Sequence, residues 1–197
     1  MHTLSMTKVE SKKILILSFF LGGSLGGLWE TVWTFATRGL LHWKSGVMFF
    51  PLCNPIYALG AMLITYYALK GKSSLKLYIF SVLITTCVEF IFSCCEELVF
   101  KTVSWDYSAY FLNVGGRINL LYSLFWGLLA LCWAKFCLPS VIKYSERVSF
   151  KTLNILCLTF VCLLSLSMVA RGISNLDFSP LWLKQLVAFF YPVQLQL

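Results

Sequence analysis

The chain has 197 residues, of which 59% are hydrophobic and 12% are charged, and its mean hydropathy is +0.80. Soluble domains carry about 25% charged residues, whereas the apolar residues here form runs of about 20 with few charges, as in multi-pass membrane proteins. This composition argues against a soluble protein. The net charge of +8 then indicates loop lysines that set membrane orientation rather than nucleic-acid binding.

The first of five expected membrane-spanning helices covers about residues 14–36, after a polar, cytoplasmic N-terminal segment at residues 1–13. Four glycines in this span predict a thin face on which another helix can pack closely: Gly22, Gly23, Gly26 and Gly27. Glu30 lies about 24 Å along the span at 1.5 Å per residue. A carboxyl group at this depth is expected to belong to a polar site inside the bundle.

A loop at residues 37–54 ends in P-L-C-N-P-I-Y, whose two prolines, four residues apart, exclude a regular helix. Irregular backbone that enters a membrane must line a cavity or be buried in protein, so Asn54 and Tyr57 are candidate binding residues. The second span, about residues 55–69, is short for a membrane crossing.

The third span, about residues 77–100, contains Glu89, Ser93 and Glu97 at intervals of four residues, so that they share one helix face. Carboxylates that face lipid are costly, so this face is expected to point into the bundle. Glu96 is rotated away from it and is expected to be solvated.

Residues 104–127 begin as a polar, aromatic loop and continue without a break into the fourth span, about residues 118–138, which is expected to end before Pro139. Asp106 and Arg117 lie at the edge of this apolar segment. Because a guanidinium group matches a carboxylate with two parallel hydrogen bonds, Arg117 is expected to pair with Asp106 or Glu97.

The fifth span, about residues 152–170, has no acidic residue. In the tail, residues 179–191 are apolar but short, with Pro180 at a plausible first helical position. The predicted fold is therefore an all-α, polytopic membrane helical bundle, residues 14–170, with five transmembrane helices. A short C-terminal interfacial or re-entrant helix and tail follow at residues 171–197.

Positive charge predicts the orientation. With the N-terminus inside, the inner segments hold ten Lys and Arg residues: Lys8, Lys12, Lys13, Lys70, Lys72, Lys76, Lys135, Lys143, Arg147 and Lys151. The outer segments hold six: Arg38, Lys44, Lys101, Arg117, Arg171 and Lys184. The sequence thus predicts a multi-pass protein of the plasma membrane with a cytoplasmic N-terminus.

Metal ions and other cofactors are not expected, because His2 and His42 have no second candidate ligand nearby and the eight cysteines form no C-x-x-C motif. Seven cysteines lie in apolar runs and are expected to be small buried thiols.

The segments W-D-Y-S, from Trp105 to Ser108, and N-V-G-G-R-I-N-L-L-Y-S-L-F-W-G-L-L, from Asn113, resemble the bacterial family of putative ABC-transporter permeases (type IV). The resemblance covers about residues 15–140 and includes E-x-x-x-S-x-x-x-E from Glu89, W-x-S-G from Trp43 and N-P-I-Y from Asn54. Phe50 and Ala58 stand where the family usually has glycine. The resemblance implies a small integral membrane protein with a permease role and no defined substrate.

Three functions fit these patterns. In the first, a transport component binds a small polar or cationic solute or a lipid head group in a carboxylate-lined cavity. Its lining would be Glu30, Glu89 and Glu97, closed on the outer side by Asp106, Tyr107, Asn113 and Arg117. The alternatives are a membrane-embedded enzyme acting on a lipid-linked substrate, for which no obvious nucleophile is present, and a non-catalytic accessory subunit.

Five spans with short loops form only a thin layer of protein around a transport path. Membrane lipid and either a second copy or a partner subunit are therefore expected as partners. The chain has no G-x-x-x-x-G-K-[ST] motif, so any ATPase would be a separate protein. Glu89 lies near mid-bilayer with no basic residue of the spans at comparable depth. It is therefore expected to be protonated, hydrated or bound to a ligand.

Overall fold

The computed structural model describes residues 7–39, 47, 49, 53–190 and 195–196. Within them, the protein is all-helical apart from two pairs of two-residue strands. Four helical segments are long and apolar enough to cross a membrane: Lys8–Ala36, Ser74–Phe100, Leu120–Ser145 and Phe150–Ser174. The all-α membrane prediction is confirmed at this level, and α2 (Pro55–Ala68), expected as a span, has only 14 residues.

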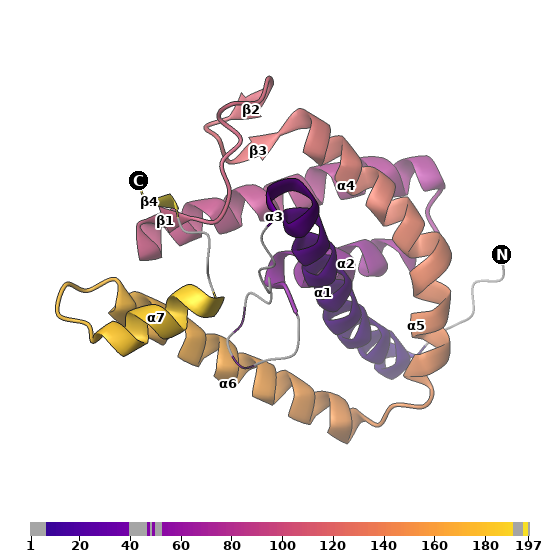
Figure 1. Ribbon diagram of the computed structural model, residues 1–197. Coiled ribbons are helices and arrows are strands. Elements are labelled where there is room, and N and C mark those ends of the chain that lie inside the picture. Colours follow the sequence, from indigo (N-terminus) through magenta and orange to yellow (C-terminus); the bar gives the residue numbers. More distant parts are fainter. Residues whose placement is uncertain (1–6, 40–46, 48, 50–52, 191–194, 197) are drawn as a thin grey trace.

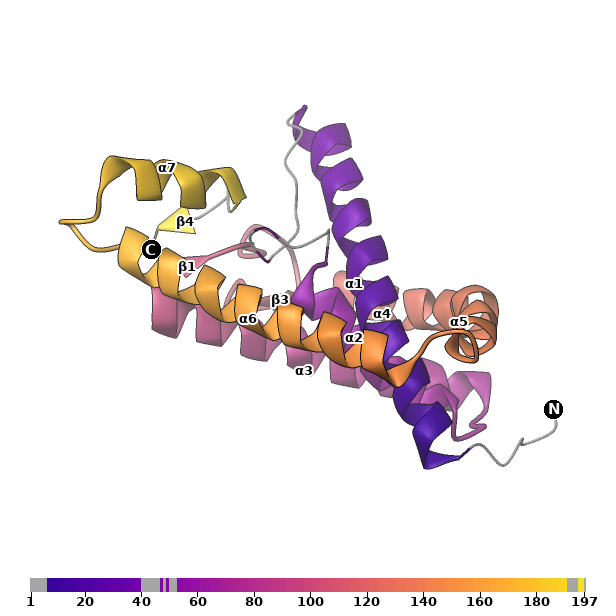
Figure 2. The same ribbon diagram turned by 90° about the horizontal axis from the view of Figure 1, so that it is seen from below.

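Figure 1 shows α3 (Ser74–Phe100), α4 (Leu120–Cys132), α5 (Leu138–Ser145) and α6 (Phe150–Ser174) arranged around α1 (Lys8–Arg38) and α2. In the view from below, the C-terminal half of α1 extends beyond the other helices (Figure 2). α1 begins at Lys8 rather than at Ile14. Thr7 and Glu10 form a capping box that satisfies the free backbone N–H groups at this end.

The glycines of α1 allow a close helix–helix contact, as the sequence predicts, and the helix that makes it is α2. A Cβ atom on Gly22 would collide with Ala61, and one on Gly26 would collide with the ring of Tyr57. The two backbones come close enough for the Asn54 N–H to donate to the Gly23 carbonyl at 2.9 Å. These glycines therefore bring the start of α2 against the middle of α1.

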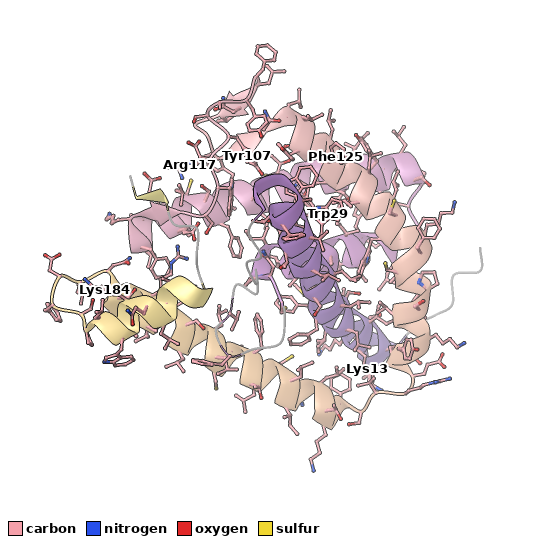
Figure 3. All side chains as sticks on the ribbon, viewed as in Figure 1. Lys13, Trp29, Tyr107, Arg117, Phe125 and Lys184 are labelled. Atoms are coloured by element: carbon pink, nitrogen blue, oxygen red, sulfur yellow. The ribbon has the colours of Figure 1, made fainter. Side chains whose placement is uncertain are left out.

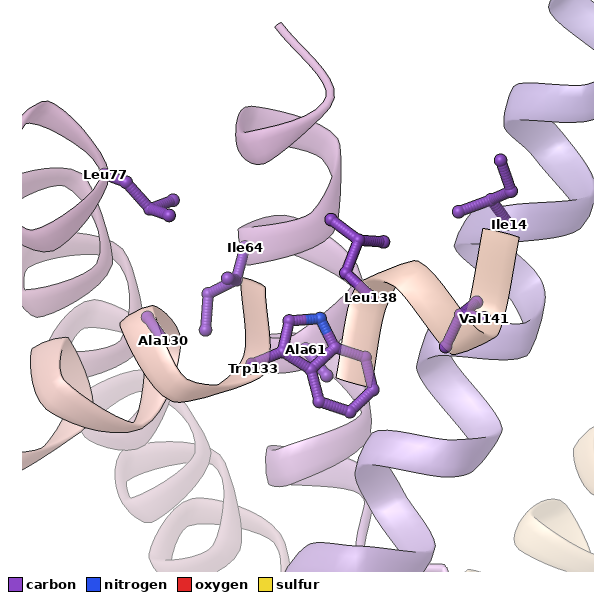
Figure 4. Close-up of a cluster of buried hydrophobic side chains, with 8 residues drawn as sticks. All are labelled: Ile14, Ala61, Ile64, Leu77, Ala130, Trp133, Leu138 and Val141. Atoms are coloured by element: carbon purple, nitrogen blue, oxygen red, sulfur yellow. The ribbon is translucent and has the colours of Figure 1, made fainter. Parts of the chain in front are cut away.

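A buried apolar cluster joins α1, α2, α3 and the α4–α5 region (Figure 4). Trp133 lies in it, 8% exposed, and its indole N–H donates to the Thr65 hydroxyl at 2.8 Å. A second cluster packs Phe160 of α6 edge-on against Phe19 and Phe20 of α1. The core thus lies between α1 and its neighbours.

The prediction that the fourth span ends before Pro139 is wrong. α4 continues through a π-helical turn, η1 (Trp133–Cys137), directly into α5. Proline lacks an N–H and its ring clashes with the carbonyl four residues earlier in an α-helix. A wider turn before Pro139 accommodates this clash, so the helix bends and continues.

The C-terminal region closes against the end of α3. α7 (Leu181–Phe190) has 10 residues and packs on α6 through Leu183 and Val187. β1 (Thr102–Val103) pairs antiparallel with β4 (Leu195–Gln196). The Asn175 amide also donates to the Phe100 carbonyl at 2.8 Å.

The prediction that the cysteines are buried is mostly wrong. All eight thiols are free, and only Cys53 is buried. Cys87, Cys95, Cys132 and Cys162 are exposed on the outside of the helices, where the lipid of a membrane would surround them.

Candidate functional site

The loop after α3 is held in shape by its own polar side chains. Asp106 accepts hydrogen bonds from the backbone N–H and the hydroxyl of Ser108, both at 2.8 Å. Asn113 donates to the carbonyls of Ser108 and Tyr110 and accepts from the Gly116 N–H. Asp106 and Asn113, predicted to close a binding cavity, thus bond within the loop.

A tight backbone crossing brings the two ends of this loop together. The Tyr107 N–H donates to the Gly116 carbonyl at 2.7 Å, and Gly116 has φ +69°, which favours glycine. A Cβ atom there would collide with the Asp106 carboxylate. The Trp105 indole also donates to the Arg117 carbonyl at 2.8 Å. β2 (Asn113–Val114) and β3 (Ile118–Asn119) form the hairpin that leads into α4.

Glu89 is the buried carboxylate beneath this loop, and its residue is 5% exposed. It accepts a hydrogen bond from the Tyr107 hydroxyl at 2.9 Å and one from the Trp126 indole N–H at 3.3 Å. α3, the loop and α4 each supply one of these three residues. Tyr107 thus faces the interior, and Figure 3 shows it at the α3–α4 end of the molecule.

Glu30 joins the same group of side chains from the other side. Its carboxylate accepts from the Tyr57 hydroxyl at 3.1 Å, and the Tyr57 ring lies 4.8 Å from that of Trp126, centroid to centroid. We call Glu30, Tyr57, Glu89, Tyr107 and Trp126 the carboxylate–aromatic cluster. Four helices and the loop between α3 and α4 meet in it.

The two carboxylates of the cluster have no positively charged partner among the described residues. In the part of the chain that the structure describes, no Lys or Arg side chain bonds to Glu30 or Glu89; both carboxylates bond only to neutral donors. Burial and the adjacent Glu89 carboxylate raise the pKa of Tyr107 far above its usual value. Tyr107 is therefore a neutral hydrogen-bond donor to Glu89 at physiological pH.

Asn54 plays a different part from the one predicted. Its side-chain oxygen accepts the Ile56 N–H at 3.0 Å, which caps the N-terminus of α2. This cap fixes where α2 begins, and thereby where Tyr57 stands. The W-x-S-G segment from Trp43 and Phe50 lies outside the described residues.

The expected pairing of Arg117 is confirmed with Glu97 and not with Asp106. The guanidinium forms an ion pair with the Glu97 carboxylate and donates to the Ser93 hydroxyl at 3.2 Å. Arg117 thus holds the loop to the shared face of α3. Its partners Ser93 and Glu97 lie one and two helical turns after Glu89, so Arg117 is outside the carboxylate–aromatic cluster.

The prediction that Glu96 is solvated is wrong. Its carboxylate lies 2.7 Å from the Arg171 guanidinium, with the two side chains 11% and 8% exposed. It also accepts from the backbone N–H and hydroxyl of Ser104. Counting residues around α3 alone missed this, because Arg171 comes from α6, 75 residues further on.

Trp126 is the cluster residue that the sequence analysis missed. It lies in an uninterrupted apolar helix, so no pattern set it apart from the lipid-facing residues around it. A buried indole N–H does need an acceptor, and Glu89 is that acceptor. The need of this N–H group for an acceptor was the one signal in the sequence that could have placed Trp126 in the cluster.

Four apolar helices of membrane-spanning length among the described residues, together with the buried carboxylate of Glu89 and the half-buried one of Glu30, define a helical integral membrane protein with a polar interior. Within this class, the chain belongs to the family described as putative ABC-transporter type IV, whose model matches residues 17–171. The suspected resemblance is confirmed. No curated protein and no solved structure matches the chain.

Proposed function

We propose that this protein is a permease-like transport component whose carboxylate–aromatic cluster binds a small polar solute or a lipid head group. A cation, or a cationic head group, fits the cluster best. One observation carries the proposal. Glu30 and Glu89 share an aromatic surrounding in which only neutral groups donate to them. Unpaired acidic side chains inside a membrane are costly and typical of solute or ion pathways.

The chemistry of the cluster favours a cation over other solutes. A cation between the two carboxylates would compensate their charge, and the faces of Tyr57 and Trp126 attract positive charge through the ring quadrupole. Tyr107 and Trp126 keep Glu89 oriented by hydrogen bonds. Asp106, Asn113, Arg117 and Glu97 hold the covering loop in place, and Asn54 holds Tyr57.

For the topology we propose five crossings in the plasma membrane with the N-terminus in the cytoplasm. α2 begins deep against the middle of α1 and completes the second crossing, and α7 lies in the interface or re-enters it. The Lys13 ammonium lies 3.5 Å from the Ser145 carbonyl and 5.9 Å from the Phe150 ring. The N-terminal segment and the segment between α5 and α6, both lysine-rich and both assigned to the cytoplasmic side, are thus neighbours. This supports the orientation.

The partners that we propose are a second copy or another membrane subunit, and a separate ATPase. Membership of a family described as ABC-transporter-related supports an ATPase partner. The extended end of α1 supports a further subunit, because Trp29 and Trp33 stack there at 6.1 Å and both remain about half exposed.

The test is cation binding by the purified full-length protein in phosphate-free detergent, followed by thermal stability. Tetramethylammonium, choline and potassium would be the probes, with glucose as the neutral probe. We expect at least one cation to raise the melting temperature in a saturable way, and the Glu89→Gln variant to bind it at least tenfold more weakly. The matched control is Glu146→Gln, since Glu146 is exposed at the far end of the bundle.

Two outcomes would contradict the proposal. One is that no cation stabilises the wild-type protein. The other is that Glu89→Gln binds as tightly as Glu146→Gln.

A further inference from the structure

An open pocket of about 440 Å³ lies at the C-terminal end of α3, outside the carboxylate–aromatic cluster. Its lining consists of Cys94, Glu97 and Leu98 from one face of α3, Lys101 directly after the last residue of α3, and Arg117 from the loop. Glu97 follows Glu89 by eight residues, about 12 Å along the helix. The pocket is therefore a separate site nearer the membrane surface, and Figure 3 shows Arg117 at this end of α3.

The charged groups of the pocket leave one positive charge uncompensated. Arg117 is paired with Glu97, whereas Lys101 is exposed and forms no ion pair with the described residues. A guanidinium carries five N–H donors, and the bonds to Glu97 and Ser93 engage two of its nitrogens. The pocket thus offers the Lys101 ammonium and the remaining Arg117 donors to an anion.

Below these charges, α3 exposes a continuous apolar stripe. Leu98, in the pocket, is 73% exposed, and Ile91 and Leu83 further down the same side are 57% and 63% exposed. Cys87 and Cys94 lie between them at helical spacing. A molecule held by its charged end at Lys101 and Arg117 would lay a hydrocarbon chain along this stripe.

We propose that this pocket binds the phosphodiester head group of a membrane phospholipid, with an acyl chain along the stripe on α3. A phosphodiester carries one negative charge, which matches the one uncompensated charge. Arginine and lysine are the usual ligands of phosphate oxygens. The apolar stripe favours a lipid over a free phosphate ion, because a phosphate ion has no hydrocarbon chain to contact the stripe.

The test is native mass spectrometry of the full-length protein, titrated in phosphate-free detergent with phosphatidylglycerol. Diacylglycerol with the same acyl chains lacks the phosphate, and sn-glycerol 3-phosphate lacks the chains. We expect phosphatidylglycerol to bind more tightly than either. Lys101→Gln is expected to weaken its binding about fivefold, the effect of about 1 kcal/mol per basic residue near an anionic lipid surface.

Lys76→Gln is the matched control, because Lys76 is also exposed but lies at the opposite end of α3. This variant is expected to leave phosphatidylglycerol binding unchanged. Equal loss in Lys76→Gln and Lys101→Gln would overturn the site, as would no loss in Lys101→Gln. Equal affinity for diacylglycerol or for glycerol phosphate would overturn the phospholipid assignment. Glu89→Gln should bind phosphatidylglycerol normally, which separates this test from that of the cation site.

Discussion

At the residue scale, the glutamates of α3 divide into three roles that the helix periodicity alone does not separate. Glu89 bonds to neutral donors, Glu97 pairs with the loop arginine, and Glu96 pairs with Arg171 of α6. The shared face of Glu89, Ser93 and Glu97 could be predicted from spacing. The partner of Glu96 could not, because it depends on how α6 packs against α3.

Because of this ion pair, we expect Glu96→Gln to destabilise the protein. Removing one partner of a buried pair leaves an uncompensated charge and costs about 3–5 kcal/mol. The measurement is thermal stability in detergent, with Glu146→Gln as the exposed control. The double variant Glu96→Leu/Arg171→Met removes both charges and should recover much of the loss. A melting temperature of Glu96→Gln equal to that of the control would contradict the pairing.

At the element scale, the α1–α2 contact positions half of the candidate site. Gly26 lies under the ring of Tyr57, and Tyr57 donates to Glu30 one turn further along α1. The glycine pattern predicted close packing but not its partner. The helix end predicted before Pro139 shows the same limit. A proline marks a disturbance of the helix, but it does not show that the chain continues through a π-helical turn, in which Trp133 is bonded to Thr65 of α2.

For this contact, we predict that Gly26→Ala weakens cation binding and lowers the melting temperature, because the new methyl group must displace the Tyr57 ring. Gly172→Ala is the control, since a Cβ atom there meets nothing within 4 Å. In the last turn of α6 it should be neutral or stabilising by up to about 1 kcal/mol. Parallel thermal and binding curves of the two variants test this. Equal behaviour of Gly26→Ala and Gly172→Ala would show that the helices do not approach closely here.

At the scale of the whole molecule, composition was enough to predict a helical membrane protein, and the family match agrees with it. The meeting of four helices and a loop in the carboxylate–aromatic cluster could not be predicted, because nothing in one sequence shows which spans are neighbours. Trp126 is the example: its role depends on α4 lying beside α3.

The proposed orientation predicts which loops reach each side of the membrane. In a cysteine-free background, Ala109→Cys should react with a membrane-impermeant maleimide added to intact cells. Ser73→Cys should react only after permeabilisation. Both positions are exposed, and Ser73 makes no side-chain capping bond. The reverse labelling pattern would place the N-terminus outside.

The role of Glu89 as a binding group is tested most directly by complementation of a deletion strain with Glu89→Gln and Glu146→Gln, with membrane levels of each protein measured in the same cells. Gln keeps the size of Glu89. Its one carbonyl oxygen can accept the Trp126 N–H, and its NH2 group can donate to the Tyr107 hydroxyl oxygen, but Gln cannot carry negative charge. The expected result is normal levels of both variants, with function lost in Glu89→Gln and retained in Glu146→Gln. Full function of Glu89→Gln at normal levels would contradict the account, because a glutamate that only packs and accepts hydrogen bonds tolerates this change.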